Sequence, residues 1–371
     1  MAAILAGCLT MAASGVHGQS IEGFPPSQHE RVTNVTGVAL QLLTEWLGPP
    51  RFTIIAVRGV AAPHQSVATA QPGVVVVPIR WLIFERDRSL ERDVITGLTR
   101  QFWRRNAPAT PFEQALVLYT AARAIHHLLE GSNFATVRFF GGLIPFPLRS
   151  VLMSPPVADP RPRAWPFDEW PADAQVGRMV RGLQTLERYA GWPTMAQALA
   201  SMRATDHGAL DAGVFAATLS AARGADVTSL VDECFKSDAV FDYAIANVQS
   251  PSSADGLFET SLTVVRLGSG IFEVAGEGDR ERSMPVLVRF ADGTELRDWF
   301  DGAAPTSTMV YTTKSPVVQA AVDPEMMLLL DVNRTNNTLA SASPIRPLGI
   351  RLALHWMSWL QHTMLAYTAL V

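Results

Sequence analysis

The stretch LERDVITGLTRQFWRR, residues 90–105, decides the fold. Its apolar side chains recur at the spacing that places them on one face of an α-helix, at Leu90, Val94, Leu98 and Phe102. We therefore expect an amphipathic helix whose apolar face packs on a core.

The sequence on either side of this helix predicts more helices and a short stretch of strands. Residues 36–48 (TGVALQLLTEWLG) have helical apolar spacing and end at a glycine. The β-branched runs FTIIAV at 52–57 and GVVVVPI at 73–79 are typical of strands. Residues 111–131 begin with proline and end with glycine, which favours a further helix.

The second half of the chain changes from helical to strand patterns. After a proline-rich segment, expected to be a loop, we expect helices over residues 174–189, 193–203, 211–222 and 227–235. From about residue 242, apolar and polar residues alternate in the runs FDYAIANVQS, LFETSLTVVRLG, IFEVAGEG, SMPVLVRFADGTE, TMVYTTK and VVQAAVDP. This alternation predicts an antiparallel β-sandwich, with a hairpin turn at Ala291-Asp292-Gly293.

The composition of the chain excludes several classes of protein. The 371 residues, 48% of them hydrophobic, suffice for two or three domains and argue against disorder. A net charge of −4 gives no indication of the positively charged surface with which proteins bind nucleic acid. The two cysteines, Cys8 and Cys234, are too few for a disulfide framework or a four-cysteine zinc site.

Both ends of the chain are apolar. The start is consistent with a secretory signal, a lipoprotein box at residues 5–8 or an internal segment left by a truncated start. Residues 352–371 contain no Asp, Glu, Lys or Arg and are about as long as a membrane-spanning helix. We expect membrane contact through this tail, and the alternative is a helix packed on the protein itself.

Several stretches, in order over residues 31–337, resemble the aminopeptidase-N family of gluzincin metallopeptidases, in particular its bacterial members. ALQLLTEWLGPPRFTIIAV resembles the opening of the catalytic domain, TAQPGVVVVP the Gly-x-Met-Glu-Asn loop and DVITGLTRQFW the zinc helix. VGRMVRGLQTLERYAGWPTMAQAL, GADVTSLVDECFKSDAVFDYAI and VDPEMMLLLDVNRTNNT resemble later helices and the closing strand. The resemblance implies an α+β fold: a thermolysin-like, mainly helical peptidase domain, an antiparallel β-sandwich and a C-terminal apolar helix.

The resemblance also shows which catalytic groups are missing. The family motif needs two His at i and i+4 for zinc and a Glu as general base. The ungapped alignment places Gly97 and Gln101 at the two His and Leu98 at the Glu. A register slipped by one residue places Thr96, Gly97 and Arg100 there and fails as well, because Arg100 has no lone pair to offer.

Three further positions follow from the same resemblance. The third zinc ligand corresponds to Glu113, the amine-recognising Glu to Ala70 and the transition-state Tyr to Val176. Glu113 would then remain as a carboxylate that pairs with Arg100 or Arg104, or these are unrelated surface charges.

Two other clusters have metal-like spacing. His126, His127 and Glu130 lie close together, but they lack a second carboxylate–histidine set, and a helix C-terminus decorated with His near the negative end of the helix dipole is the favoured interpretation. Asp323 and Asp331 offer oxygen ligands of the kind calcium prefers, or they shape turns.

We therefore expect a non-catalytic zinc-aminopeptidase-like protein with a binding or scaffolding role and no cofactor. The alternative is a divergent metallopeptidase that holds zinc on His126, His127 and Glu130. The expected parts are an N-terminal segment (1–30), a degenerate peptidase-like domain (31–246), a β-sandwich (247–340) and a hydrophobic helix (346–371). The expected partner is a peptide or protein, and the expected location is a bacterial membrane or cell envelope.

Overall fold

The computed structural model describes residues 18–52, 54–60, 72–79, 89–104, 109–129, 174–205, 210–235, 239–272, 284–340 and 356–357. The chain divides into two compact units. Unit 1 comprises residues 1–109 and 117–134, and unit 2 comprises residues 110–116 and 135–371. Each unit is described by itself.

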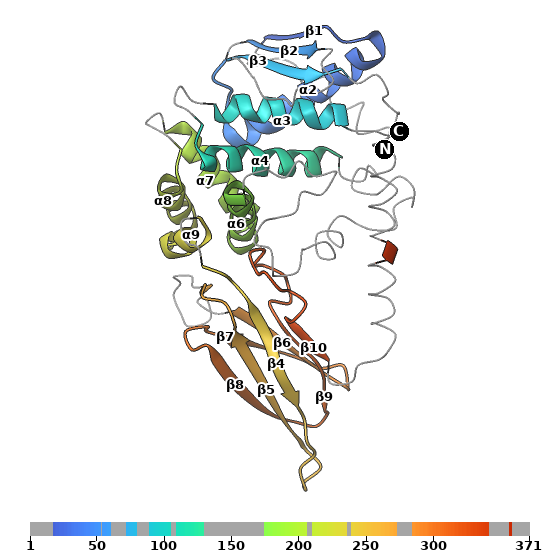
Figure 1. Ribbon diagram of the computed structural model, residues 1–371, viewed down its shortest axis with the longest axis vertical. Helices are drawn as coiled ribbons and strands as arrows, with labels where there is room; N and C mark the ends of the chain where they lie inside the picture. The colour runs from blue at the N-terminus through green and yellow to red at the C-terminus, as the bar shows by residue number, and fades with distance from the viewer. Residues whose placement is uncertain are drawn as a thin grey trace. The chain divides into compact units, whose positions relative to one another are not determined.

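Unit 1 contains a small parallel sheet with helices beside it (Figure 1). The strands pair in the order β1-β2-β3, with bounds β1 Gly18–Glu22, β2 Ile54–Val60 and β3 Val74–Pro78. The helices are α2 Pro26–Leu47, α3 Ser89–Trp103 and the larger part of α4 Pro111–Leu129. α2 starts well before the predicted residue 36, because Pro26 at its first turn already has the fixed φ of a helix.

Unit 2 begins with helices that match the predicted ones closely. They are α6 Ala174–Ala190, α7 Trp192–Ala204, α8 Ala212–Arg223 and α9 Thr228–Phe235. α8 begins where Asp211 accepts a hydrogen bond from Val214 N at 2.9 Å, and it ends at Gly224 in the left-handed conformation. Arg178 of α6 donates to the carbonyl oxygens of Cys234, Glu233 and Ala239 and so joins α6 to the end of α9.

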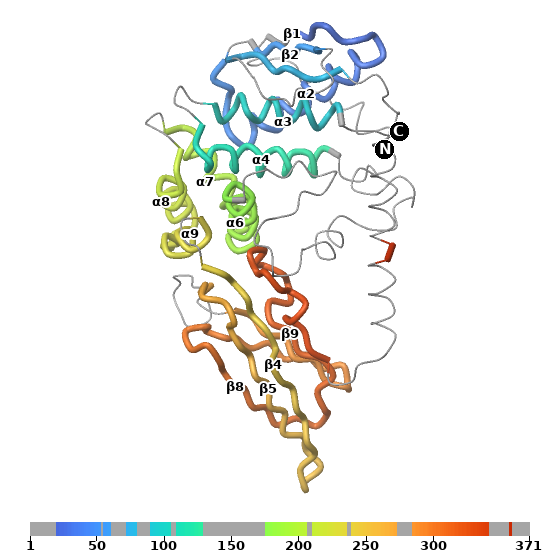
Figure 2. The backbone as a smooth tube through the Cα atoms, viewed as in Figure 1, coloured from blue at the N-terminus to red at the C-terminus, as the bar shows by residue number. Residues whose placement is uncertain are grey.

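The remainder of unit 2 forms two antiparallel sheets (Figure 2). One has the strand order β4-β5-β8 and the other has the order β10-β9-β6-β7. Their bounds are β4 Tyr243–Gln249, β5 Phe258–Arg266, β6 Met284–Phe290, β7 Glu295–Phe300, β8 Thr306–Thr313, β9 Val317–Val322 and β10 Thr338–Ala340. Strand β7 was not predicted, because its sequence ELRDWF carries three charges. Of the predicted strand at 271–278, Ile271 and Phe272 are described and are not in a strand.

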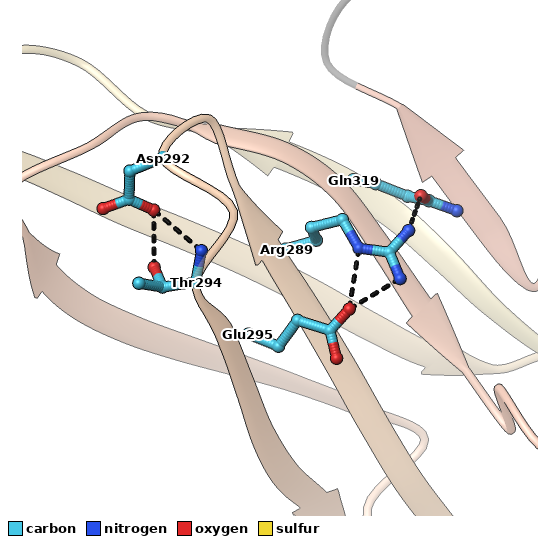
Figure 3. Close-up of polar contacts among 5 residues, drawn as sticks. All are labelled: Arg289, Asp292, Thr294, Glu295 and Gln319. Carbon is cyan, nitrogen blue, oxygen red and sulfur yellow. Dashed lines mark hydrogen bonds and ion pairs between the residues drawn. The ribbon is translucent and has the colours of Figure 1, made fainter.

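The predicted hairpin turn is confirmed between β6 and β7 (Figure 3). The Asp292 carboxylate accepts hydrogen bonds from Thr294 N at 2.9 Å and Thr294 Oγ1 at 2.7 Å. Beside the turn, Arg289 donates to Glu295 Oε1 and to Gln319 Oε1, which links three neighbouring strands on one face. These contacts join β7, β6 and β9 at this end of the sheet.

Membrane contact through residues 352–371 stays a prediction, because only residues 356–357 of that tail are described. Within the described ranges, no helix has the length and apolar character that crossing a membrane requires.

Candidate functional site

The candidate site lies where helix α3 packs on strand β3 within unit 1 (Figure 1). The predicted apolar face of α3 is buried, including Leu90, Val94, Leu98 and Phe102. At the start of the helix, Arg31 of α2 makes a two-pronged ion pair with Glu91, with Nη2 2.8 Å from Oε1 and 2.9 Å from Oε2. Because Glu91 is almost fully buried, this pair joins α2 to α3 in a region that water hardly reaches.

Gly97, which the sequence resemblance aligns with the first zinc-binding His of the aminopeptidase-N family, lies directly on β3. A Cβ atom added there would be only 2.3 Å from Val75 Cγ1, well inside van der Waals contact. A side chain at residue 97 therefore requires Val75 to leave its rotamer or the strand to move away. The space that a ligand would need is already filled by Val75.

Gln101, which the same resemblance aligns with the second zinc-binding His, binds the backbone of β3. Its Oε1 accepts a hydrogen bond from Gly73 N at 3.0 Å, and its Nε2 donates to Val74 O at 2.9 Å. The side chain is fully buried. We call this pair of hydrogen bonds the Gln101 bridge. In it, both the oxygen and the nitrogen of the side-chain amide bind the backbone at the start of β3.

Leu98, which the resemblance aligns with the general-base Glu, is also fully buried. It neither binds nor releases a proton. Its neighbour Thr99 donates its hydroxyl to Ile95 O at 2.8 Å within the helix. The stretch from Ile95 to Gln101 therefore serves packing and backbone hydrogen bonding.

Zinc does not fit these residues. Zn²⁺ is held by His nitrogen, Cys sulfur or carboxylate oxygen, and Gly97 and Leu98 provide none of these. Gln101 could offer a metal only its amide oxygen, a weak ligand, and this oxygen already accepts a hydrogen bond from Gly73 N. Among the residues that the structure describes, no group of three or more His, Cys, Asp or Glu side chains is placed to hold a metal ion.

Glu113 lies at the start of α4 in a helix-capping sequence. Its backbone N–H donates to Thr110 Oγ1 at 3.0 Å, and Thr110-Pro111-Phe112-Glu113 has the spacing of a capping box. Its residue is buried. This geometry gives Thr110 the capping role at the start of α4, while the pairing of Glu113 with Arg100 or Arg104 stays a prediction.

The remaining predicted site residues are scattered. Val176 is buried in α6 of unit 2, and Ala70 lies outside the described residues. His126 and His127 are exposed near the end of α4, and the ring of His127 packs edge-on against Trp46 at 5.7 Å. Glu130, the third member of that cluster, also lies outside the described residues.

The sequence did not identify Gly73 and Val75 as the partners of α3. Two signals were present: Gly97 and Gln101 are four apart and so share a helical face, and Gly73 opens a β-branched run. The pairing itself joins residues that are 28 positions apart.

In unit 2, Asp323 and Asp331 accept backbone hydrogen bonds as turn-shaping residues do. The Asp323 carboxylate accepts from Met327 N and Leu328 N, and Asp331 accepts from Asn333 N and Tyr243 N. Burial is the main reason that the pKa of Asp331 is raised to about 6, against the lowering effect of its donors.

No protein-family model matches the chain, and no curated protein matches it by sequence. Solved structures do match. The chain is similar to Legionella pneumophila aminopeptidase A, solved in complex with aspartic acid, with a TM-score of 0.52 and 13% identity. The match covers 84% of this chain and 36% of the aminopeptidase, so the chain spans about a third of that protein's length.

A second match is the M1 zinc metallopeptidase of Deinococcus radiodurans, with a TM-score of 0.39 and 17% identity over 59% of this chain and 49% of the metallopeptidase. The likeness to the Legionella enzyme concerns the fold. The chain therefore has a mixed helix and sheet fold that resembles part of an aminopeptidase.

Proposed function

We propose that this chain is a peptidase-like protein that binds a peptide or protein and does not hydrolyse it. The observation that carries the proposal is the packing of α3 on β3: the face of Gly97 and Gln101 contacts Val75 and the backbone of β3. In the resembled family, this same face carries two zinc ligands. Here it serves to hold the helix against the strand.

The chemistry of the side chains supports the same conclusion. Hydrolysis by this scaffold needs a Lewis acid and a base for the attacking water. Glycine, leucine and a hydrogen-bonded glutamine amide supply neither. What remains of such a scaffold is a surface for binding, and the proposal includes that the two antiparallel sheets of unit 2 pack together as the β-sandwich expected from the sequence.

The alternative is a divergent metallopeptidase that uses His126 and His127 together with Glu130. The exposure of both His side chains on α4 keeps this alternative open to experiment. A site of this kind would still need a base and a third ligand from outside the described residues.

The test is to purify the full chain with added zinc, measure its metal content and assay hydrolysis of a panel of amino-acid anilides. We expect less than a stoichiometric amount of zinc and no hydrolysis above a blank, with the same result for His127→Ala. Stoichiometric zinc and hydrolysis that are both lost in His127→Ala, but kept in the exposed control Gln114→Ala, would overturn the proposal in favour of the alternative.

Membrane contact through residues 352–371 belongs to the same proposal, as does a location at a membrane or cell envelope. It rests on the absence of charged residues from that tail. Flotation of the full chain with phospholipid vesicles, compared with a chain that ends at residue 351, tests it. Equal flotation of both chains would remove this part of the proposal.

A further inference from the structure

The two sheets of unit 2 have four edge strands: β4 and β8 in one sheet, and β10 and β7 in the other. An edge strand exposes backbone N–H and C=O groups that can pair with another chain. Proteins prevent this with charged side chains, very short strands or β-bulges. Whether an edge carries such protection therefore indicates whether it is kept from pairing.

Three of the four edges carry a protective feature. β7 has charged side chains at Glu295, Arg297 and Asp298. β10 is only three residues long. β4 has an irregularity between Ile245 and Asn247, and Ile245 N donates to Asn336 O at 3.0 Å, which occupies part of that edge.

β8 carries none of these features. Its sequence TSTMVYTT has eight residues without a charge, a proline or a glycine, and threonine, valine and tyrosine all favour strands. Its pairing with β5 is regular from Thr306 to Thr313, without a bulge. Across the described ranges of the chain, β8 pairs with β5 alone and lies at the margin of its sheet (Figure 1).

The hydrogen bonding to β5 determines which backbone groups of β8 face the open edge. Arg266 N donates to Pro305 O at 2.8 Å, and in an antiparallel pair the residues alternate between facing the partner and facing away. Residues 307, 309, 311 and 313 therefore direct their backbone groups toward β5. The N–H and C=O groups of Thr306, Thr308, Val310 and Thr312 point to the open edge.

The two faces of β8 also differ. Tyr311 lies on the face toward the other sheet and donates its hydroxyl to Asp298 of β7 at 2.7 Å. Thr306, Thr308, Val310 and Thr312 are exposed on the opposite face, and Val310 keeps 58% of its surface accessible. The same four residues thus present both their side chains and their backbone groups.

We propose that β8 pairs antiparallel with β8 of a second copy of this chain, about a two-fold axis at Met309. A two-fold axis perpendicular to a sheet makes the pairing antiparallel and places the same surface on both sides. This register puts Thr306 opposite Thr312 of the second copy and Thr308 opposite its Val310. It is the register that pairs all four outward-facing residues of each strand.

The side chains suit this self-pairing. No charge lies on β8, so no like charges meet across the two-fold axis. The sheet already contains a cross-strand threonine contact of this kind, with Thr263 Oγ1 and Thr308 Oγ1 3.4 Å apart. Because one strand buries little area, the dimer is expected to be weak and reversible.

The test is sedimentation velocity of the full chain from about 1 to about 100 µM, the range in which a weak dimer dissociates. We expect a monomer–dimer equilibrium that Val310→Lys abolishes. The matched control is Ser261→Lys, which adds the same charge on the same face opposite Val310, one strand in from the edge. Circular dichroism checks that both variants fold.

A second variant tests the register. Met309→Cys in a Cys8→Ser background should form a disulfide-linked dimer on oxidation, because the two Met309 Cα atoms would face each other in a close, non-hydrogen-bonded pair. Val310→Cys in the same background should cross-link much more slowly. A monomer at every concentration, or a dimer that Val310→Lys leaves intact, would overturn the proposal.

Discussion

The Gln101 bridge gives the sharpest prediction, with Gln101→Met as the perturbation. Methionine keeps the length and much of the volume of the side chain but removes both hydrogen bonds to β3, at 3.0 Å to Gly73 N and 2.9 Å to Val74 O. Gly73 is buried, so its N–H loses its partner without gaining water. We expect the free energy of unfolding of unit 1 to fall by about 2 to 4 kcal/mol, from one lost donor and one lost acceptor.

Two readouts measure this change. Urea unfolding followed by tryptophan fluorescence reports on Trp103 at the end of α3, whose Nε1 donates to Thr120 Oγ1 at 3.1 Å. Hydrogen exchange followed by mass spectrometry over residues 72–79 reports on the amide of Gly73 directly. Gln41→Met is the matched control, because Gln41 is exposed on α2 of unit 1 and its replacement should change stability by less than about 0.5 kcal/mol.

One result would refute the reasoning about the Gln101 bridge. If Gln101→Met unfolds within about 0.5 kcal/mol of the wild-type chain and exchange over residues 72–79 is unchanged, the bridge does not hold α3 on β3. The proposal that this helical face now serves packing would then lose its main support.

Three further predictions follow from single contacts. Gly97→Ala should lower the free energy of unfolding by about 1 to 2 kcal/mol despite the better helix propensity of alanine. The same change in a Val75→Ala background should cost much less, as measured by urea unfolding, and additive effects of the two changes would contradict the predicted contact. Because the folded-state pKa of Asp331, about 6, lies above its ordinary value of 3.8, the stabilisation from protonation is complete below pH 3.8 and is lost as the pH rises through 6. This contribution of Asp331 to the free energy of unfolding is about 3 kcal/mol, and it should be absent from Asp331→Asn. If the free energy of unfolding of Asp331→Asn changes with pH between about 4 and 6 as steeply as that of the wild-type chain, the prediction is wrong. Burial raises the pKa of the Cys234 thiol to about 12, so in a Cys8→Ser chain it should react with a disulfide reagent at pH 8 only at the rate of unfolding, and rapid labelling of the folded chain would show that Cys234 is accessible.

Most of the secondary structure could be predicted from local patterns. The apolar spacing of residues 90–105 predicted α3, and Ala291-Asp292-Gly293 predicted the hairpin turn. β7 was missed because three charges in six residues mask its alternation. Of the strand predicted at 271–278, only Ile271 and Phe272 are described, and neither is in a strand; alternation over so short a run does not require a partner strand.

The candidate site was predicted in part. The resemblance located Gly97, Leu98 and Gln101 on one helix, and their chemistry indicated that zinc would not be held there. The capping of α4 by the Thr110 hydroxyl was not foreseen, although the Thr110-x-x-Glu113 spacing is a local signal for it. The metal site suggested at His126 and His127 rested on their spacing in the sequence alone.

The sequence by itself determined which functional groups the α3 face can offer, because the chemistry of glycine, leucine and glutamine belongs to the side chains and does not depend on the fold. Only the tertiary structure decided what that face does. The contact of Gly97 with Val75 and the hydrogen bonds of Gln101 join segments more than twenty residues apart, and no local pattern encodes such a pairing. The same holds for β8, whose open edge depends on the strand order of its sheet.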